Sequence, residues 1–269
     1  MNYNIPLIVL IILCTFLPLA SAVLIDNEGT APSTSSPVYI DGEDLVYEVS
    51  WTFVKLGTVH IKTLGNLKAI AYIDSYDGLP FVDLHSVNYT QMDSSFYCRS
   101  GYAIDKDGND WKGLSYSATP GTGRVAIEGL SQHDPASPPF KREPMDTIQL
   151  STRAFVDGLS IGYFPRLFIH SVRTANVTTL LKGKVGTTTF YFTDNRTTES
   201  IDALDDPVRV VEVEGTTNAV GVFGMTGDFT GWFSDDACSV PIKGKLKVLL
   251  GSVTIELVKW NRKGWQPPQ

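Results

Sequence analysis

The sequence predicts a mainly β fold: an antiparallel, curved sheet of half-barrel or barrel-like form with one short helix. Three observations lead to this prediction. Apolar and polar residues alternate with a period of two in DLVYEVSW, residues 44–51, which is the pattern of a strand that buries one face. Several similar runs follow, rich in β-branched and aromatic residues and separated by turn signals such as Lys106-Asp107-Gly108-Asn109. Residues 145–159 have helical spacing instead.

Residues 1–22 are predicted to be a cleaved signal peptide for export. The segment is apolar for most of its length and ends in Ala20-Ser21-Ala22, a small-x-small cleavage site. Its start lacks the usual basic residues, so an uncleaved N-terminal anchor is the alternative. Residues 23–38, rich in Ser, Thr and Pro, are expected to form a flexible tether. We therefore expect an exported protein, either periplasmic or secreted.

Residues 39–262 are expected to form a single β-rich domain, followed by a tail at 263–269. In the first predicted strand, apolar and aromatic side chains on one face alternate with mostly polar side chains on the other. A hairpin turn is predicted at 54–57, after which the next strand runs antiparallel to the first. Later strands are predicted at AIAYID (69–74), SFYCRSGYAI (95–104), GRVAIEG (123–129), RLFIHSV (166–172), NVTTLLKG (176–183), TTTFYFT (187–193), PVRVVEVEG (207–215), TGDFTGWF (226–233), VPIKGKLKVLL (240–250) and SVTIELVKW (252–260).

The predicted helix occupies MDTIQLSTRAFVDGL, residues 145–159. Asp146 is a suitable cap, Ile148 and Phe155 fall at helical spacing, and Gly158 is a suitable stop. Such a helix would pack on the sheet or plug it. It is too short to cover the apolar inner face, so either the sheet closes on itself or an apolar ligand covers the remainder. We expect a gap beneath the helix near Ile148 and Phe155. Its expected walls are Leu45, Tyr47, Val49, Trp51, Val253, Ile255 and Leu257.

The composition excludes some partners and leaves the state of the cysteines open. The net charge of −7 argues against nucleic acid, because phosphate neutralisation needs clustered Lys and Arg. After the N-terminal segment, no apolar stretch approaches the roughly 18 residues that a membrane span needs. Cys98 and Cys238 could pair in an oxidising compartment and stabilise the fold, or they could stay two buried free thiols.

Three candidate catalytic or metal-binding patterns lack the surrounding residues or element order that their chemistry requires. The G-x-S-x-G match at 158–162 follows a predicted helix and precedes a strand-like run, which reverses the order of a nucleophile elbow. The acidic loop at 105–110 lacks the glycine and acid positions of a calcium loop. The four histidines are scattered without ligand spacing. Asp235 and Asp236 are predicted to form a hairpin turn rather than a carboxylate pair. We therefore predict no catalytic residue, no metal site and no cofactor.

Lys243, Lys245 and Lys247 alternate along one predicted strand. They could form a basic strip for an anionic headgroup or glycan. The ordinary explanation is a solvated strand face or a protected edge, and it is the one we expect.

Two segments carry further motifs: GEDLVYEVSWTFVKLGTVHI (42–61) and GWFSDDACSVPIKGKLKVLLGSVTIELV (231–258). Together they resemble the first and last signatures of the exported bacterial proteins grouped as domain of unknown function 3108. The resemblance implies an envelope or secreted location and a fold similar to the half-barrels of lipoprotein-localisation and lipid-carrier proteins. It implies no catalytic residue. The matched positions are Gly42, Leu45, Tyr47, Trp51, Gly57, Trp232, Ser234, Asp235, Asp236, Pro241 and Gly251.

One departure from the family pattern is Cys238, where members more often carry a polar or basic residue. With Cys98 it suggests a disulfide particular to this branch. The hypothesis from the whole sequence is a non-enzymatic, exported β-domain that binds an apolar ligand, such as a lipid or acyl chain, or an envelope partner protein. One alternative is a hydrolase acting on envelope lipid or glycan. Another is a structural, self-associating surface protein. The sequence identifies no ligand-binding residue.

Overall fold

The computed structural model describes residues 37–79, 83–134, 136–219, 227–248 and 251–269, all of which belong to the unit Ala31–Gln269. The predicted signal peptide lies outside these ranges, as does all but the end of the predicted tether. In the part of the chain that is described, no helix combines the length and the apolar character that a membrane crossing requires.

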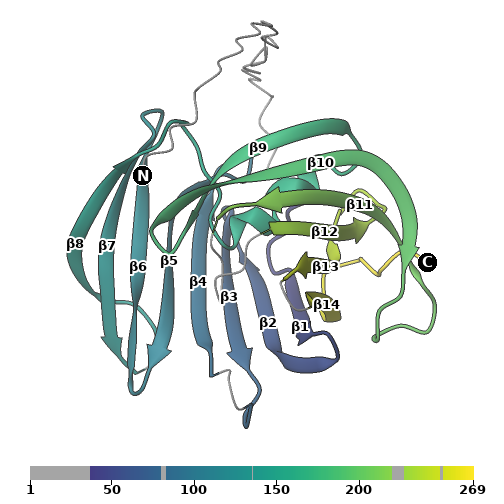
Figure 1. Ribbon diagram of the computed structural model, residues 1–269, viewed down its shortest axis with the longest axis horizontal. Coiled ribbons are helices and arrows are strands. Elements are labelled where there is room, and N and C mark those ends of the chain that lie inside the picture. The colour runs from purple at the N-terminus through teal and green to yellow at the C-terminus, as the bar shows by residue number, and fades with distance from the viewer. Residues whose placement is uncertain (1–36, 80–82, 135, 220–226, 249–250) are drawn as a thin grey trace, which may run out of the picture. The chain divides into compact units, whose positions relative to one another are not determined.

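Fourteen strands form one antiparallel sheet, which confirms the predicted fold class (Figure 1). The sheet begins with β8, runs back through the strands to β1, passes to β14 and descends to β9. The strands are β1 (Asp44–Trp51), β2 (Val54–Leu64), β3 (Lys68–Ser75), β4 (His85–Met92), β5 (Cys98–Asp107), β6 (Asp110–Thr119), β7 (Arg124–His133), β8 (Lys141–Gln149), β9 (Val172–Leu181), β10 (Lys184–Glu199), β11 (Val208–Thr217), β12 (Gly227–Ser234), β13 (Pro241–Lys247) and β14 (Ser252–Asn261).

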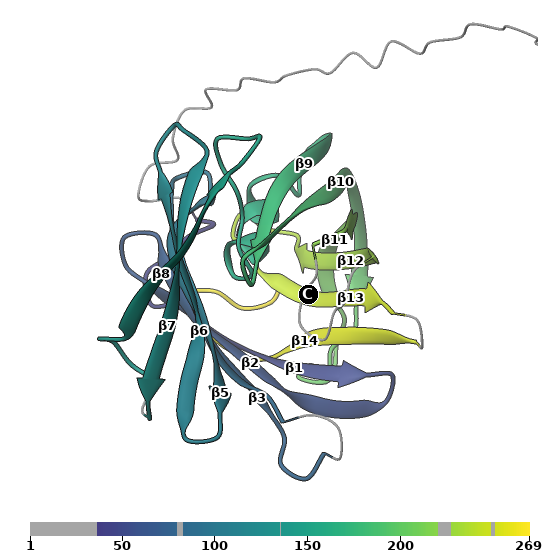
Figure 2. The ribbon, with the colours of Figure 1, turned by 60° about the vertical axis from the view of Figure 1, so that its left-hand side comes forward.

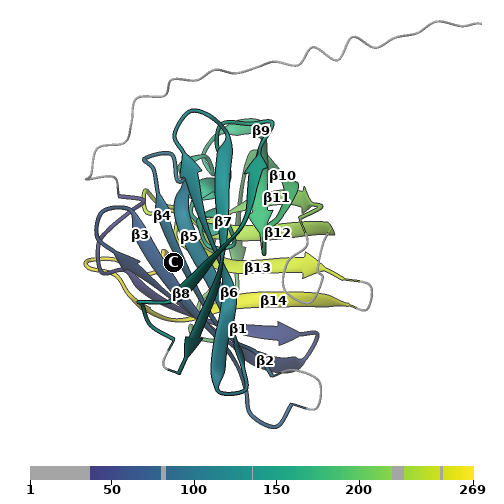
Figure 3. The same ribbon diagram turned by 90° about the vertical axis from the view of Figure 1, so that its left-hand side faces the viewer.

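The sheet therefore has two arms, a first arm of β1–β8 and a second arm of β9–β14, joined where β1 pairs with β14. The arms curve toward each other, and the connection from β8 to β9 lies between them (Figures 2 and 3). This connection bonds to both arms. Cys98 N of β5 donates to Phe155 O at 2.8 Å, and Val156 N donates to Thr178 O of β9 at 2.9 Å.

The helix predicted at 145–159 is wrong in position. Lys141–Gln149 forms the edge strand β8, in which Ile148 lies opposite Val125 of β7. Pairing with β7 satisfies the backbone hydrogen-bonding groups on one side of this strand. Pro144 is tolerated because the strand lies at the edge of the sheet. The short helices are η1 (Ser160–Gly162) and η2 (Phe164–Leu167). The strand predicted at 166–172 is therefore also wrong, except for Val172, which begins β9.

Local hydrogen bonds explain why η1 forms where it does. Asp157 Oδ1 accepts the backbone N–H groups of Leu159 at 3.1 Å and Ser160 at 2.7 Å, and Ser160 Oγ accepts the N–H of Asp157 at 2.8 Å. This reciprocal arrangement satisfies amides that the first turn leaves free. Pro165 lies in the first turn of η2, where its missing N–H costs nothing.

The connection fills one part of the sheet's inner face with apolar side chains. Phe155, Val156, Leu159 and Phe164 are buried to between 0 and 6 % exposure. Val156 and Phe164 pack with strands of the second arm, and Leu159 packs with Ala69 and Ala71 of the first arm. We call this region the packed end.

The residues at 263–269, expected to be a tail, pack against the domain. Trp265 is 6 % exposed, and its Nε1 donates to Asp236 Oδ2 at 2.8 Å. Arg209 N of β11 donates to Pro268 O at 2.8 Å. The C-terminal segment is therefore part of the folded unit.

The predicted disulfide is wrong, because Cys98 and Cys238 are both free thiols. Cys98 is buried in an apolar cluster with Tyr116 and Phe155, whereas Cys238 packs against a different cluster beside the β12–β13 turn. Burial, followed by the nearby Asp157 carboxylate, raises the pKa of the Cys98 thiol well above its usual value. Cys98 is therefore an inert core thiol.

Candidate functional site

The inner face of the sheet encloses a cavity of about 730 Å³ next to the packed end. Both arms contribute to its wall, and the side chains that line it are predominantly apolar. Many of them are only half-buried, so that part of their apolar surface is left uncovered. Such side chains include Ile61, Ile73, Leu114, Phe229, Leu246 and Val253.

Strand alternation predicted part of this wall correctly. The cavity is lined by Leu45, Tyr47, Val253 and Ile255. Val49 lies opposite Ile255, so alternation along β1 and β14 turns these four side chains to the same face of the sheet. The expected wall residues Val49, Trp51 and Leu257 are not among the lining residues, and neither are Ile148 and Phe155. The gap does adjoin the short helices, where Leu159, Ile161 and Tyr163 border it.

Small residues on the inner face leave the space open. Gly231 of β12 lies opposite Gly244 of β13, and Gly244 lies opposite Ile255 of β14. A Cβ on Gly244 would come within 2.9 Å of Ile255 Cγ2. Ala71 and Ala103 are lining residues on the first arm. The missing side-chain volume explains why a sheet of this size does not fill its own interior.

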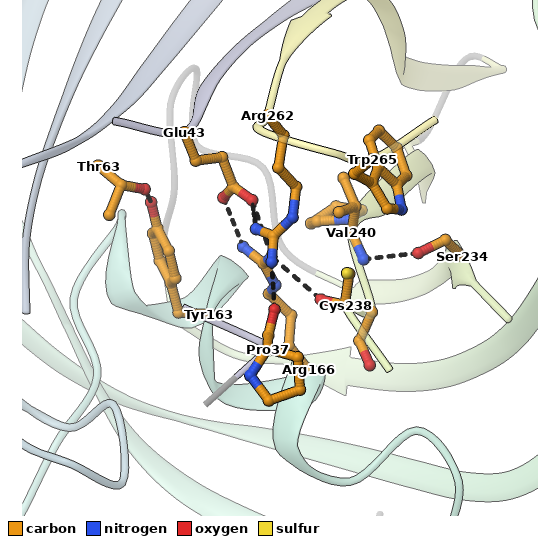
Figure 4. A network of polar contacts seen from close by, with 12 residues as sticks. Pro37, Glu43, Thr63, Tyr163, Arg166, Ser234, Cys238, Val240, Arg262 and Trp265 are labelled. Carbon is orange, nitrogen blue, oxygen red and sulfur yellow. Dashed lines mark hydrogen bonds and ion pairs between the residues drawn. The ribbon is translucent and has the colours of Figure 1, made fainter. Parts of the chain in front are cut away.

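A buried charge cluster lies where the cavity meets the packed end (Figure 4). Arg166 Nη1 donates to Glu43 Oε1 at 2.8 Å, and its Nη2 donates to Glu43 Oε2 at 3.1 Å and to Cys238 O at 3.1 Å. Arg262 also donates to Glu43 Oε2 and to Pro37 O. Glu43, Arg166 and Arg262 are only 2, 3 and 6 % exposed. The cluster joins four segments that are distant in the sequence.

The charges in this cluster fix one another's ionisation. Burial raises the pKa of Glu43, but Arg166 and Arg262 lower it by more, so that it lies below its ordinary value. Burial lowers the pKa of Arg166, and Glu43 raises it by more. The cluster thus holds two positive charges against one negative. Arg166 Nε is buried and has no hydrogen-bond partner among the described residues.

Two tyrosines complete the polar border of the cavity. Tyr47 Oη donates to Pro241 O at 3.0 Å, and Tyr163 Oη shares a hydrogen bond of 2.9 Å with Thr63 Oγ1. Burial, followed by the Glu43 carboxylate, raises the pKa of both hydroxyls above their ordinary value. Both remain protonated at neutral pH and act as fixed hydrogen-bonding groups.

Asp235 and Asp236 lie in the turn between β12 and β13, as predicted. Asp236 Oδ1 accepts from Ser234 Oγ at 3.0 Å, Cys238 N at 2.8 Å and Ser239 N at 3.2 Å. Asp235 Oδ1 instead lies 3.5 Å from Arg196 Nη1. The two carboxylates therefore have different roles, and Asp236 is the one that organises the turn.

At the other motif positions, the residue fits a backbone constraint, bounds a strand or forms a hydrogen bond between strands. Gly42 and Gly251 have φ values of 80° and 89°, which favour glycine. A Cβ on Gly57 would come within 2.1 Å of Asp74 O. Trp51 and Pro241 end and begin their strands, and Trp232 Nε1 donates to Glu212 Oε2 at 3.0 Å.

Ser160, the serine of the G-x-S-x-G match, has a structural role. Ser160 is fully buried in η1, where its Oγ accepts the Asp157 N–H. Within the described ranges, no group of three or more His, Cys, Asp or Glu side chains could hold a metal ion.

The charge cluster was missed from the sequence. Glu43 precedes the first strand within the motif, and Arg166 stands alone in the apolar run YFPRLF. An isolated arginine in such a run signals a buried ion pair, but its partner is 123 residues away.

A solved structure shares this fold. It is described as a beta-barrel-like protein of domain of unknown function 1849 from Brucella abortus. The TM-score is 0.50 at 11 % identity, covering 83 % of this chain and 98 % of that one. At this identity the similarity concerns the fold alone. The sequence matches no family model and no curated protein.

Proposed function

We propose that this protein is an exported, non-enzymatic β-domain whose cavity binds an apolar ligand, such as a lipid or an acyl chain. The observation that carries the proposal is the cavity of about 730 Å³ with its predominantly apolar lining. That volume lies within the roughly 300–1,000 Å³ of small-molecule sites, which combine apolar walls with a few fixed polar groups.

The half-buried side chains of the wall favour an apolar ligand. Ile73, Leu246 and Val253 have no side chain packed over their cavity-facing surface. Covering apolar surface contributes about 25 cal/mol per Å², so an apolar ligand gains affinity from walls that the protein leaves uncovered. The polar border formed by Tyr47, Tyr163 and the charge cluster supplies orientation.

Export and the family assignment are parts of the same proposal. Their support is the signal-like segment 1–22 and the resemblance to domain of unknown function 3108 at 42–61 and 231–258. N-terminal sequencing of the protein recovered from its host tests the cleavage after residue 22. An uncleaved N-terminus would contradict it.

Native mass spectrometry of the protein from its own host tests the ligand directly, with co-purifying lipid as the expected result. A second arm uses an environment-sensitive fatty-acid probe with Ile73→Lys, which places a charge in the wall. We expect probe affinity to fall by tenfold or more, because the ammonium must be desolvated. Tyr72→Lys is the matched control, since Tyr72 is adjacent and 38 % exposed. No bound lipid and no probe binding by the wild-type protein would contradict the proposal.

A further inference from the structure

Phe53 is the most exposed large apolar side chain among the described residues, with 90 % of its surface exposed. It lies at the tip of the β1–β2 hairpin, where Thr52 has a left-handed φ of 58°. Turns normally carry polar residues or glycine at such places. A single exposed apolar residue needs no explanation by itself, so its surroundings decide its meaning.

The hairpin tip lies beside the cavity wall. Trp51, two residues before Phe53, is paired with Val253, which lines the cavity. Thr52 N donates to Ser252 O at 3.0 Å, so this tip adjoins the start of β14. The β1–β2 hairpin and the strands β13 and β14 reach the same side of the sheet (Figures 2 and 3). The hairpin tip that carries Phe53 is therefore next to the part of the cavity wall formed by Val253.

Basic side chains flank the tip, in a chain whose net charge is −7. Lys55 pairs with Glu48 at 2.8 Å, so these two charges cancel. Lys245 and Lys247 end β13, are exposed, and form no ion pair with any described residue. Two exposed carboxylates, Asp228 of β12 and Glu214 of β11, lie on strands further from the hairpin than β13. The charge on β13 nearest the tip is thus positive, and aromatic residues beside lysines are typical of protein surfaces at the headgroup level of a membrane.

We infer that the β1–β2 tip docks this protein on a lipid surface that carries anionic headgroups. Phe53 enters the boundary between headgroups and acyl chains, and Lys245 and Lys247 face the anionic headgroups. The cavity then lies beside the surface, so an apolar ligand passes between the two with little exposure to water. Only this last step rests on the proposed function. The docking itself depends on the hairpin tip and the lysines.

Vesicle flotation tests the inference, with vesicles of phosphatidylcholine alone or mixed with phosphatidylglycerol, and with the protein as its host processes it. We expect wild type to float with the anionic vesicles. Phe53→Ser should weaken this binding about tenfold or more, since it removes the aromatic side chain that would be buried in the lipid surface. Val172→Ser is the control, because Val172 is 81 % exposed but begins β9, whereas the cavity contacts the end of that strand at Leu181. Lys245→Glu with Lys247→Glu should abolish the preference for anionic vesicles.

Fluorescence at the hairpin tip separates docking by the tip from any vesicle binding by the N-terminal segment. Phe53→Trp should gain quenching by lipids with brominated acyl chains, above the quenching of the native tryptophans. Equal flotation of wild type and Phe53→Ser, equal losses for Phe53→Ser and Val172→Ser, or no added quenching would each overturn the inference. The fatty-acid probe is measured on the same variants. Retained probe binding by Phe53→Ser separates failure of docking from failure of the cavity proposal.

Discussion

The packed end and the uncovered end of the inner face are built from the same strands and are filled differently. At the start of β1, the connection from β8 to β9 covers the sheet, and Glu43, Arg166 and Arg262 close the border with ion pairs. Toward the end of β1 and the start of β14, apolar residues such as Ile73 and Val253 face the cavity instead. Gly231 and Gly244, which have no side chain, provide the space for the cavity.

If the cavity binds the proposed ligand, the chain divides stability and binding between the two ends. Buried ion pairs are costly unless every partner is present, so the packed end depends on a few contacts between distant segments. The uncovered end contributes little packing and borders the cavity that we propose as the ligand site. Substitutions at the two ends should therefore have opposite consequences for stability and for binding.

The largest expected effect is that of Glu43→Ala at the packed end. The substitution leaves Arg166 and Arg262 buried without a counter-charge, and the free energy of unfolding should fall by about 3–5 kcal/mol. Denaturant unfolding measures it. Glu143→Ala, which removes an exposed carboxylate paired with Lys141 on edge strand β8, should leave the unfolding midpoint unchanged. A loss below about 1 kcal/mol for Glu43→Ala would mean that the two arginines find other partners.

Acid should weaken the same end, though less than truncation does. The pKa of Glu43 is lower in the folded protein than its ordinary value of 4.5, so near that pH the unfolded chain binds more protons. The stabilisation is therefore complete above about pH 4.5 and is lost as the pH falls through the lower folded value. Unfolding measured against pH should show this loss in wild type, and Glu43→Gln should show a shallower decline. Parallel pH curves would contradict the assignment.

The turn between β12 and β13 should show the next effect in size. Asp236→Ala removes the acceptor of Cys238 N and of Trp265 Nε1, and should cost about 2–3 kcal/mol. Asp235→Ala removes only the longer contacts with Arg196 and His170 and should cost less than about 1 kcal/mol. Thermal unfolding of the two variants compares neighbouring carboxylates directly. Equal losses would show that the turn does not depend on the hydrogen bonds of Asp236.

The strands were predictable because alternation places each side chain on a face independently of distant contacts. The shared face of Leu45 and Tyr47, and that of Val253 and Ile255, followed from the period of two alone. The position of the helix did not follow. Ile148 and Phe155 satisfy helical spacing, yet pairing with β7 makes Lys141–Gln149 a strand, and local spacing carries no information about that pairing.

The candidate site was predictable only as an apolar interior. Its charge cluster depends on contacts between residues 43, 166 and 262, and nothing in the neighbourhood of one residue identifies the others. The missing disulfide has the same cause. Cys98 and Cys238 were compatible with pairing by compartment, but they belong to different apolar clusters.

The last comparison makes the same substitution, Val→Ala, at each of the two ends. Val211 is fully buried in the cluster beside the connection, and Val211→Ala should cost about 1.5–3 kcal/mol, since it removes packed methyl groups and leaves a void. Val253 is half-buried in the cavity wall. Val253→Ala should cost less than about 1 kcal/mol in protein stripped of lipid, because no neighbour packs against its exposed methyl groups.

A bound ligand should change that ranking. When the fatty-acid probe is present in excess, its binding stabilises the folded state by mass action. Val253→Ala weakens the contact with the probe, so it should lose part of this stabilisation, whereas Val211→Ala should gain as much as wild type. Unfolding with and without probe gives both numbers for each variant. Equal gains for the two variants would show that Val253 does not contact the ligand, and would shift the binding surface away from β14.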